Sequence, residues 1–187
     1  MDGFYIERVP ILRRARRDDA EALAVVESAS WQAAYRGILP GRYLRSLQPD
    51  ALTRRWRQRL RGDSVWVAEI GSHVVGYSVS GPCRDDDMEA GFAGEIYELY
   101  VHPRLQGRGL GHDLMAQTWL ELSKRMHRWG VLWVLEQNHS AQRFYERNGM
   151  TIDRKRRPYR IRGHRVMAVR YARPLNPFDP LTALDQS

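Results

Sequence analysis

The sequence has little cysteine and almost no lysine, and it contains no long apolar run. Its single cysteine, Cys83, cannot form an internal disulfide or a zinc site made of several thiolates. Because no stretch of about 18 apolar residues is present, we expect no membrane-spanning helix. Charges appear within residues 1–8 before any apolar stretch, which argues against a secretory signal. These absences predict a soluble, reduced, cytoplasmic protein.

Arginine supplies nearly all of the positive charge. The 187 residues include 30 Lys plus Arg against 22 Asp plus Glu, a net charge of +8, and only Lys124 and Lys155 are lysines. Arginine binds phosphate through two parallel hydrogen bonds, so the charge favours an anionic partner, either nucleic acid or a cofactor that carries phosphate. A compositional bias without function would produce the same enrichment, so charge alone does not choose between these partners.

The order of apolar patterns predicts one α/β domain over residues 10–174, with terminal extensions at 1–9 and 175–187. A strand–helix–strand unit from Gly94 to Leu135 fits a right-handed parallel crossover, whereas residues 65–80 read as an antiparallel hairpin. We therefore expect a mixed antiparallel and parallel central sheet flanked by about four helices. The expected strands are 10–16, 65–70, 74–80, 94–101, 131–135, 151–157 and 166–171, and the expected helices are 18–37, 41–61 with a break at Pro49, 110–129 and 138–148.

A glycine-rich segment lies between the strand at 94–101 and the long helix that follows. Gly107, Gly109 and Gly111 remove side chains at alternate positions, so a backbone could approach a ligand there. The start of the helix adds unpaired N–H groups and the positive end of its dipole, which suit a phosphate or pyrophosphate. The segment lacks the Lys-Ser or Lys-Thr ending of a P-loop, and His112 stands where a dinucleotide fingerprint needs glycine. A turn that only caps the helix remains the alternative.

This segment and its flanks resemble the GCN5-related N-acetyltransferase (GNAT) superfamily. The family signature is matched by Gln106-Gly107-Arg108-Gly109-Leu110-Gly111, and similarity extends from Ile11 to Leu175. The resemblance implies a GNAT-like fold and transfer of an acetyl group from acetyl-coenzyme A to a primary amine of a small molecule or peptide. The residues that carry it on either side are Glu95-Ile96-Tyr97-Glu98-Leu99-Tyr100-Val101-His102-Pro103, Asn138, Ala141, Phe144, Tyr145 and Asn148-Gly149-Met150.

The resemblance also implies a cofactor site. The backbone N–H groups from Gly107 to Gly111 would bind the pyrophosphate, and the backbone of 99–101 would pair with the pantetheine arm where two parallel strands splay apart. Asn138 would contact that arm, although it could instead cap the helix it precedes. With no ligand cluster beside the histidines that flank the loop, we expect no metal site. The expected cofactor-binding residues are Leu99, Tyr100, Val101, Gln106, Gly107, Arg108, Gly109, Leu110, Gly111 and Asn138.

Acetylation of an amine needs a base, because a protonated amine has no lone pair. Glu95 and Glu98 are the candidates, acting directly or through water, and both remain open. Glu95 aligns with the base of the histone-modifying branch of the family, whereas Glu98 is nearer the expected acyl site. Their spacing places them on opposite faces of a strand unless a bulge intervenes, so one should be structural. Tyr145 falls where many members place a general acid, and its alternative is a core aromatic.

Two features bear on the acceptor. Trp31 and Tyr35 share a face of the first long helix, in a region that the resemblance places at the acceptor site; core packing is the other interpretation. The acidic loop at 85–89 would attract a cationic amine, or it is simply solvated. We use the name acidic loop for the segment that carries Asp85, Asp86, Asp87 and Glu89.

A basic cluster near the C-terminus supports the alternative function, a non-catalytic module that senses acyl-coenzyme A or binds nucleic acid. No helix-turn-helix or RNA-binding motif accompanies it, so we do not expect nucleic acid as the partner. The cluster could equally bind the 3′-phosphate of the cofactor, form a homodimer interface or stay solvated. Its members are Arg154, Lys155, Arg156, Arg157, Arg160, Arg162 and Arg165.

Overall fold

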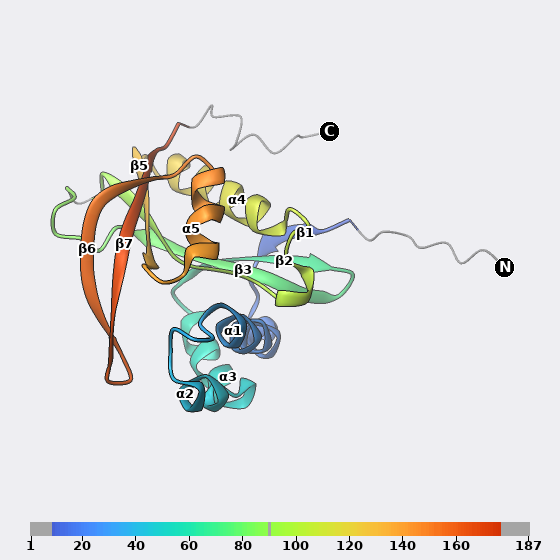
Figure 1. The fold of residues 1–187 in the computed structure, drawn as a ribbon. Coiled ribbons are helices and arrows are strands. Elements are labelled where there is room, and N and C mark those ends of the chain that lie inside the picture. The colour runs from blue at the N-terminus through green and yellow to red at the C-terminus, as the bar shows by residue number, and fades with distance from the viewer. Residues whose placement is uncertain (1–8, 90, 177–187) are drawn as a thin grey trace.

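The computed structural model describes residues 9–89 and 91–176, which form one seven-stranded sheet with helices on both faces (Figure 1). The strand order is β1-β2-β3-β4-β5-β7-β6, and only β4 and β5 are parallel neighbours. The mixed sheet expected from the sequence is therefore confirmed. The strands are β1 Ile11–Arg14, β2 Ser64–Ile70, β3 His73–Pro82, β4 Ala93–Val101, β5 Trp129–Leu135, β6 Thr151–Ile161 and β7 His164–Pro174.

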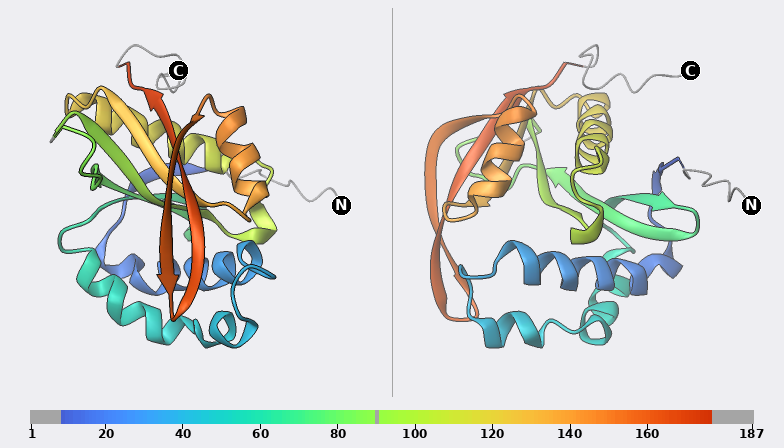
Figure 2. Two further views of the ribbon diagram at one scale, coloured as in Figure 1. Left: turned by 60° about the vertical axis from the view of Figure 1, so that its left-hand side comes forward. Right: turned by 45° about the vertical axis from the view of Figure 1, so that its right-hand side comes forward.

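In the described part of the chain, five α-helices cover the sheet, together with two short 3-10 helices. α1, α2 and α3 lie on one face, and α4 and α5 lie on the other (Figure 2). Within β3 the side chains alternate between these layers: Tyr77 packs in the cluster beneath α1 and α3, while Ser78 hydrogen-bonds Thr118 of α4 at 2.6 Å. The helices are α1 Ala20–Ala34, α2 Gly41–Ser46, α3 Pro49–Arg59, α4 Leu110–Lys124 and α5 His139–Arg147, with η1 at Arg17–Asp19 and η2 at Pro103–Leu105.

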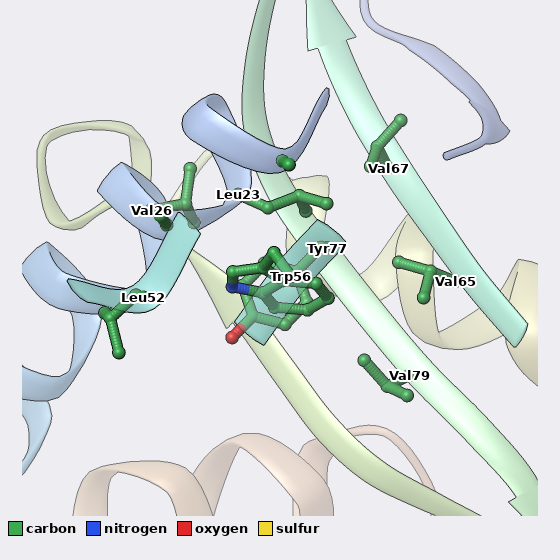
Figure 3. Packing of buried hydrophobic residues seen from close by; sticks show 10 residues of the cluster. Leu23, Val26, Leu52, Trp56, Val65, Val67, Tyr77 and Val79 are labelled. Carbon is green, nitrogen blue, oxygen red and sulfur yellow. The ribbon is translucent and has the colours of Figure 1, made fainter. Parts of the chain in front are cut away.

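The α1–α3 layer is anchored by Trp56, which is fully buried (Figure 3). Its ring lies 4.9 Å from the ring of Tyr77, and its indole Nε1 donates a hydrogen bond of 2.8 Å to Glu27 of α1. The side chain thus joins α3 both to the sheet and to α1. It combines a large apolar contact with a satisfied polar group, the arrangement in which a buried tryptophan is most stabilising.

Replacement of Trp56 by alanine is expected to lower the free energy of unfolding by about 3–5 kcal/mol, because it leaves a cavity and removes a hydrogen-bond donor from Glu27. Trp129 is 38% exposed and provides the control. Its alanine variant should lose clearly less stability in the same denaturant titration. Equal losses at the two positions would show that Trp56 does not anchor the layer.

The main difference between the expected and observed helices is the end of α4. The segment 41–61 divides at Pro49 as expected, which gives five α-helices among the described residues. The long helix at 110–129 ends at Lys124, five residues early, because the chain turns through a left-handed conformation at Met126 (φ 69°). Gly130, expected to end that helix, lies in β5. A Cβ there would come within 2.7 Å of the Trp119 ring, so glycine permits close packing of α4 on the sheet.

The β6–β7 hairpin is longer than expected and turns at Arg162 and Gly163, both with positive φ. It extends beyond the other strands toward the α1–α2 connection in all views (Figures 1 and 2). Val166 and Ala168 of β7 join a buried cluster with Leu39 and Leu44. The hairpin therefore covers one end of the layer formed by α1, α2 and α3.

The expected terminal extensions fall mostly outside the described residues. Leu175 is described, is 8% exposed and packs in the cluster between the sheet and α4. Among residues 9–89 and 91–176, no helix combines the length and the apolar character that crossing a membrane requires.

Candidate active site

The parallel pair β4–β5 separates halfway along its length. Pairing runs from Ala93 opposite Trp129 to Ile96 opposite Leu132 and then stops. Beyond that point β4 stays paired to β3 as far as Val101, and β5 stays paired to β7 as far as Leu135. The edge of β4 from 97 to 101 therefore has no β5 partner, which leaves backbone groups of a central strand available to an extended ligand.

A bulge in β4 determines where its two carboxylates point. Val79 of β3 pairs with Glu98, but its neighbour Ser80 pairs with Ile96, so Tyr97 is an extra residue. Ile96 packs on the α4 side, whereas Glu98 accepts a hydrogen bond of 3.0 Å from the Tyr77 hydroxyl on the α1–α3 side. The extra residue therefore places Glu95 and Glu98 on the same face, not on opposite faces.

The two carboxylates differ in their partners. Glu98 forms an ion pair of 2.9 Å with Arg59 of α3 in addition to its bond with Tyr77. Glu95 is only 4% exposed, accepts the backbone N–H of Arg84 at 3.0 Å and forms no ion pair within the described residues. Burial raises the pKa of both carboxyls. Glu95 is thus the less constrained of the two.

The glycine-rich loop presents a row of unused donors. Gly107 (φ 77°) and Gly109 (φ 84°) adopt the left-handed conformation, and the first helical bond of α4 runs from Asp113 N–H to the Gly109 carbonyl at 3.1 Å. Among the described residues, no acceptor is bonded to the backbone N–H groups of 107–112. We call these six groups the donor loop. With the helix dipole behind them, they have the arrangement of donors that suits an anion.

Packing holds the donor loop at the end of β4. Gln106 Nε2 donates to the Val101 carbonyl at 3.1 Å, and the Leu110 side chain is buried. A Cβ on Gly111 would lie 3.3 Å from the Phe144 ring, so glycine lets α5 approach α4. Arg104 and Arg108 are exposed at the rim of the loop.

Residues of α5 lie on the other side of the separated strands. Asn138 caps the helix, since its Oδ1 accepts the Ala141 N–H at 3.2 Å. Tyr145 packs against Phe144 and Tyr171, with ring centroids 5.3 and 6.2 Å away, and its hydroxyl makes no hydrogen bond within the described part of the chain. Burial raises the pKa of Tyr145.

Tyrosine hydroxyls of other elements affect the electrostatics of Tyr145. Tyr35 of α1 adds to the rise in the Tyr145 pKa. The Tyr35 hydroxyl shares a hydrogen bond of 2.8 Å with the Tyr100 hydroxyl. Glu98 acts electrostatically on both Tyr35 and Tyr100. The Tyr35–Tyr100 hydrogen bond thus joins α1 to the stretch of β4 that has no β5 partner.

Trp31 and Tyr35 pack as the core interpretation predicts, and their contact with an acceptor stays a prediction. Their rings contact at 4.9 Å, and Tyr43 of α2 lies 6.3 Å from Trp31. All three pack against the buried cluster that also receives Trp133 of β5 and Tyr159 of β6. They are core residues of a layer that borders the same face as Glu95 and Glu98.

The acidic loop is only partly solvated: Asp85 and Asp87 are paired with basic side chains, whereas Asp86 and Glu89 are exposed. Asp85 pairs with Arg157 at 2.6 Å and with Arg170 at 2.9 Å, and it accepts the Trp133 indole N–H at 2.9 Å. Asp87 also pairs with Arg170, at 2.8 Å. Arginines of the β6–β7 hairpin therefore neutralise Asp85 and Asp87, two of the four acids of the loop. Both segments were visible in the sequence, but their pairing depends on the sheet order.

Three of the seven members of the basic cluster form ion pairs. Lys155 pairs with Asp87 at 3.0 Å, Arg156 with Glu136 at 2.5 Å and Arg157 with Asp85. The remaining members are exposed along β6, the turn and β7. No group of three or more His, Cys, Asp or Glu side chains in the described residues could hold a metal ion.

Comparison with known proteins agrees with this geometry. Uncharacterized N-acetyltransferase YuaI of Bacillus subtilis (strain 168) is 34% identical over 130 residues, which cover 69% of this chain and 73% of that protein. The structure of PaiA N-acetyltransferase from Thermoplasma acidophilum in complex with coenzyme A has a TM-score of 0.65 at 20% identity, covering 86% of this chain and 98% of that one.

A third likeness is the structure of YncA, a putative acetyltransferase from Salmonella typhimurium, with acetyl-CoA. Its TM-score is 0.66 at 24% identity, covering 90% of this chain and 95% of that one. The model of the acetyltransferase (GNAT) family matches residues 28–150, from α1 to the end of α5. The chain therefore belongs to the GNAT family and is an acetyltransferase.

Proposed function

We propose that this protein transfers the acetyl group of acetyl-coenzyme A to a primary amine of a small molecule or peptide. One observation carries the proposal: the unpaired edge of β4 leads directly into the donor loop. A pyrophosphate fits the donor loop, and an extended arm fits beside β4. The two solved structures, one in complex with coenzyme A and one with acetyl-CoA, support this choice.

The residues present suit that cofactor. The N–H groups from Gly107 to Gly111 would bind the pyrophosphate, flanked by Gln106, Arg108 and Leu110, whose main chain shapes the loop. Leu99, Tyr100 and Val101 would pair with the pantetheine arm through their backbone, and the Nδ2 group of Asn138 would donate to it. When bound, the cofactor supplies an activated thioester.

Three side chains would then act in the reaction: one accepts a proton, one donates a proton and one positions the strand. Glu95 accepts the proton of the incoming ammonium, directly or through water, because it is buried and forms no ion pair among the described residues. Tyr145 donates its proton to the departing thiolate. Glu98 is a positioning residue, since Arg59 and Tyr77 hold it at the bulge. A backbone N–H of Leu99 or Val101 would stabilise the developing oxyanion.

The pH dependence of catalysis separates the two carboxylates. Burial raises the pKa of Glu95 and the charge of Asp85 raises it further, while the Arg84 N–H and the charges of Arg157 and Arg84 oppose the rise. A base must be ionised, so kcat/KM should fall as pH drops through this raised pKa. Glu95→Gln should lower kcat/KM by about 100-fold or more and abolish that acid limb. Glu98→Gln should retain the fall of kcat/KM at acid pH. If only Glu98→Gln removes that fall, Glu98 and not Glu95 is the base.

A thiol-release assay tests the function itself. Purified protein with acetyl-coenzyme A and a panel of primary amines should release free thiol only when an amine is present. A protein that binds coenzyme A in a titration but releases no thiol with any amine would be a non-catalytic binding module, and the proposal would be wrong.

A further inference from the structure

Exposed basic side chains lie on two segments that meet where the tip of the β6–β7 hairpin packs against α2 (Figure 2). Residues 28–49 and 154–176 contain no Asp or Glu, although the chain has 22 acidic residues in all. Val166 of the hairpin and Leu44 of α2 belong to one buried cluster, which holds the two segments together. We call the exposed basic side chains around this contact the hairpin–α2 surface. They are Arg36, Arg42, Arg45, Arg160, Arg162, His164 and Arg165.

The six arginines of this surface form no ion pair with any described residue. Arg156 and Arg157, which lie nearer the start of the same strand, are by contrast paired with Glu136 and Asp85. Because the side chains of the surface are exposed, their guanidinium donors can be reached by a ligand.

The hairpin places two of these arginines directly opposite each other. Arg160 of β6 is the register partner of Arg165 of β7, so both side chains point to the same face with Cβ atoms about 4.5–5.5 Å apart. Like charges in this arrangement destabilise a sheet. An anion between the two guanidinium groups would replace their repulsion with two charge-assisted contacts.

The turn of the hairpin adds a third arginine at a position that does not favour it. Arg162 and Gly163 connect the two strands, and both have positive φ (48° and 85°). A two-residue turn of this kind favours asparagine, aspartate or glycine at its first position, because other side chains are disfavoured in the left-handed region. Charge repulsion and an unfavourable backbone conformation thus occur at one hairpin tip. Neither stabilises the fold, so both indicate a binding function.

The chemistry of the surface discriminates among anionic partners. Large exposed apolar side chains, which would insert into a membrane, are absent from α2 and from residues 159–166. Partly exposed tyrosines lie among the arginines instead, since Tyr43 stands between Arg42 and Arg45 in the chain and Tyr159 precedes Arg160. Cations that follow a phosphate backbone, next to rings on which bases stack, are typical of sites for single-stranded nucleic acid. An acidic peptide would use only the cations.

We propose that the hairpin–α2 surface binds the phosphate backbone of a single-stranded nucleic acid, in addition to the acetyl transfer proposed above. Phosphate contacts position a nucleic acid without reading its sequence, so this binding needs none of the recognition motifs that the chain lacks. The net charge of +8 adds long-range attraction for the same partner. RNA and DNA share the backbone chemistry, and the test therefore includes both.

Fluorescence anisotropy with labelled oligouridylate and oligodeoxythymidylate of equal length measures the binding. At least one should bind, and a preference identifies RNA or DNA as the source of the ligand. The association constant should fall as salt is raised, because each phosphate contact releases counterions. Joint replacement by Arg160→Gln, Arg162→Gln and Arg165→Gln should weaken binding about tenfold or more and reduce the slope of log K against log salt by about 2. Binding of neither oligonucleotide would overturn the proposal.

A second triple variant removes the same charge elsewhere. Arg16 and Arg17 precede α1 and Arg61 follows α3, at the end of this layer away from the hairpin, and all three are exposed. With Arg16→Gln, Arg17→Gln and Arg61→Gln together, the salt slope should stay that of the parent protein. If the two triple variants weaken binding equally, net charge alone is responsible and the proposal is wrong.

Arg162→Asn separates binding from folding. Asparagine suits the turn better than arginine, so the variant should unfold at the same or a higher temperature, while its salt slope with the preferred oligonucleotide falls by about 0.7. Poly-L-glutamate supplies carboxylates without bases, and it should compete with the oligonucleotide only weakly at equal charge concentration. An unchanged slope in Arg162→Asn, or competition by poly-L-glutamate as strong as that by unlabelled oligonucleotide, would contradict the proposal; the latter result would assign the surface to an acidic polypeptide.

Discussion

Gly109→Ala is expected to weaken binding of coenzyme A by about tenfold or more while the protein remains folded. Gly109 has φ 84° and begins α4, and a methyl group there would meet no atom closer than 3.9 Å. The cost is therefore one of backbone conformation, about 1–2 kcal/mol for an L-residue in the left-handed region. Relief of that strain would rotate the N–H groups of the donor loop away from the pyrophosphate. Calorimetric titration with coenzyme A measures the change.

Gly163 provides the matched control for this experiment. It has φ 85° at the turn between β6 and β7, also with open space around its Cα. Gly163→Ala should lose a similar amount of stability in thermal unfolding but bind coenzyme A as the parent protein does. If both variants bind normally, the conformation at Gly109 does not matter for the cofactor and the donor loop is not its site.

Tyr145→Phe should reduce kcat by about 100-fold or more and leave stability nearly unchanged. The Tyr145 hydroxyl has no hydrogen-bond partner in the described residues, so its removal breaks no bond within the fold. Burial raises its pKa, which keeps the proton on the hydroxyl at neutral pH, as a general acid requires. Single-turnover kinetics on the variant would separate the chemical step from product release.

Tyr171 shows what a structural tyrosine does instead. It is 1% exposed, and its hydroxyl donates to Glu146 at 2.7 Å. Tyr171→Phe should lower stability by about 1 kcal/mol, because Glu146 loses its donor, and should leave kcat unchanged. An unchanged kcat in Tyr145→Phe, or an equal loss in both variants, would remove Tyr145 from the chemistry.

Sequence patterns were informative where local physics decides the structure. Alternating glycines at 107, 109 and 111 between a strand and an amphipathic helix predicted an anion loop, and no residue that the structure describes accepts a hydrogen bond from the N–H groups there. The parallel crossover followed from the order of apolar segments, and β4 and β5 are the parallel pair. These features depend on residues that are close in the sequence, so they can be predicted from the sequence alone.

Features that depend on distant segments could not be predicted. The β4 bulge at Tyr97 is set by the register with β3, and it places Glu95 and Glu98 on the same face. The neutralisation of Asp85 by Arg157 and Arg170 joins segments more than seventy residues apart. The early end of α4 follows from the left-handed conformation of Met126. Methionine does not favour that conformation, so the sequence does not predict where the helix ends.

A crystal structure of the protein with coenzyme A tests the central claim most directly. The account predicts the pyrophosphate within hydrogen-bond distance of the N–H groups of Gly107, Gly109 and Gly111, with the pantetheine arm beside 99–101. A pyrophosphate bound elsewhere, with those N–H groups still free of ligand, would contradict it.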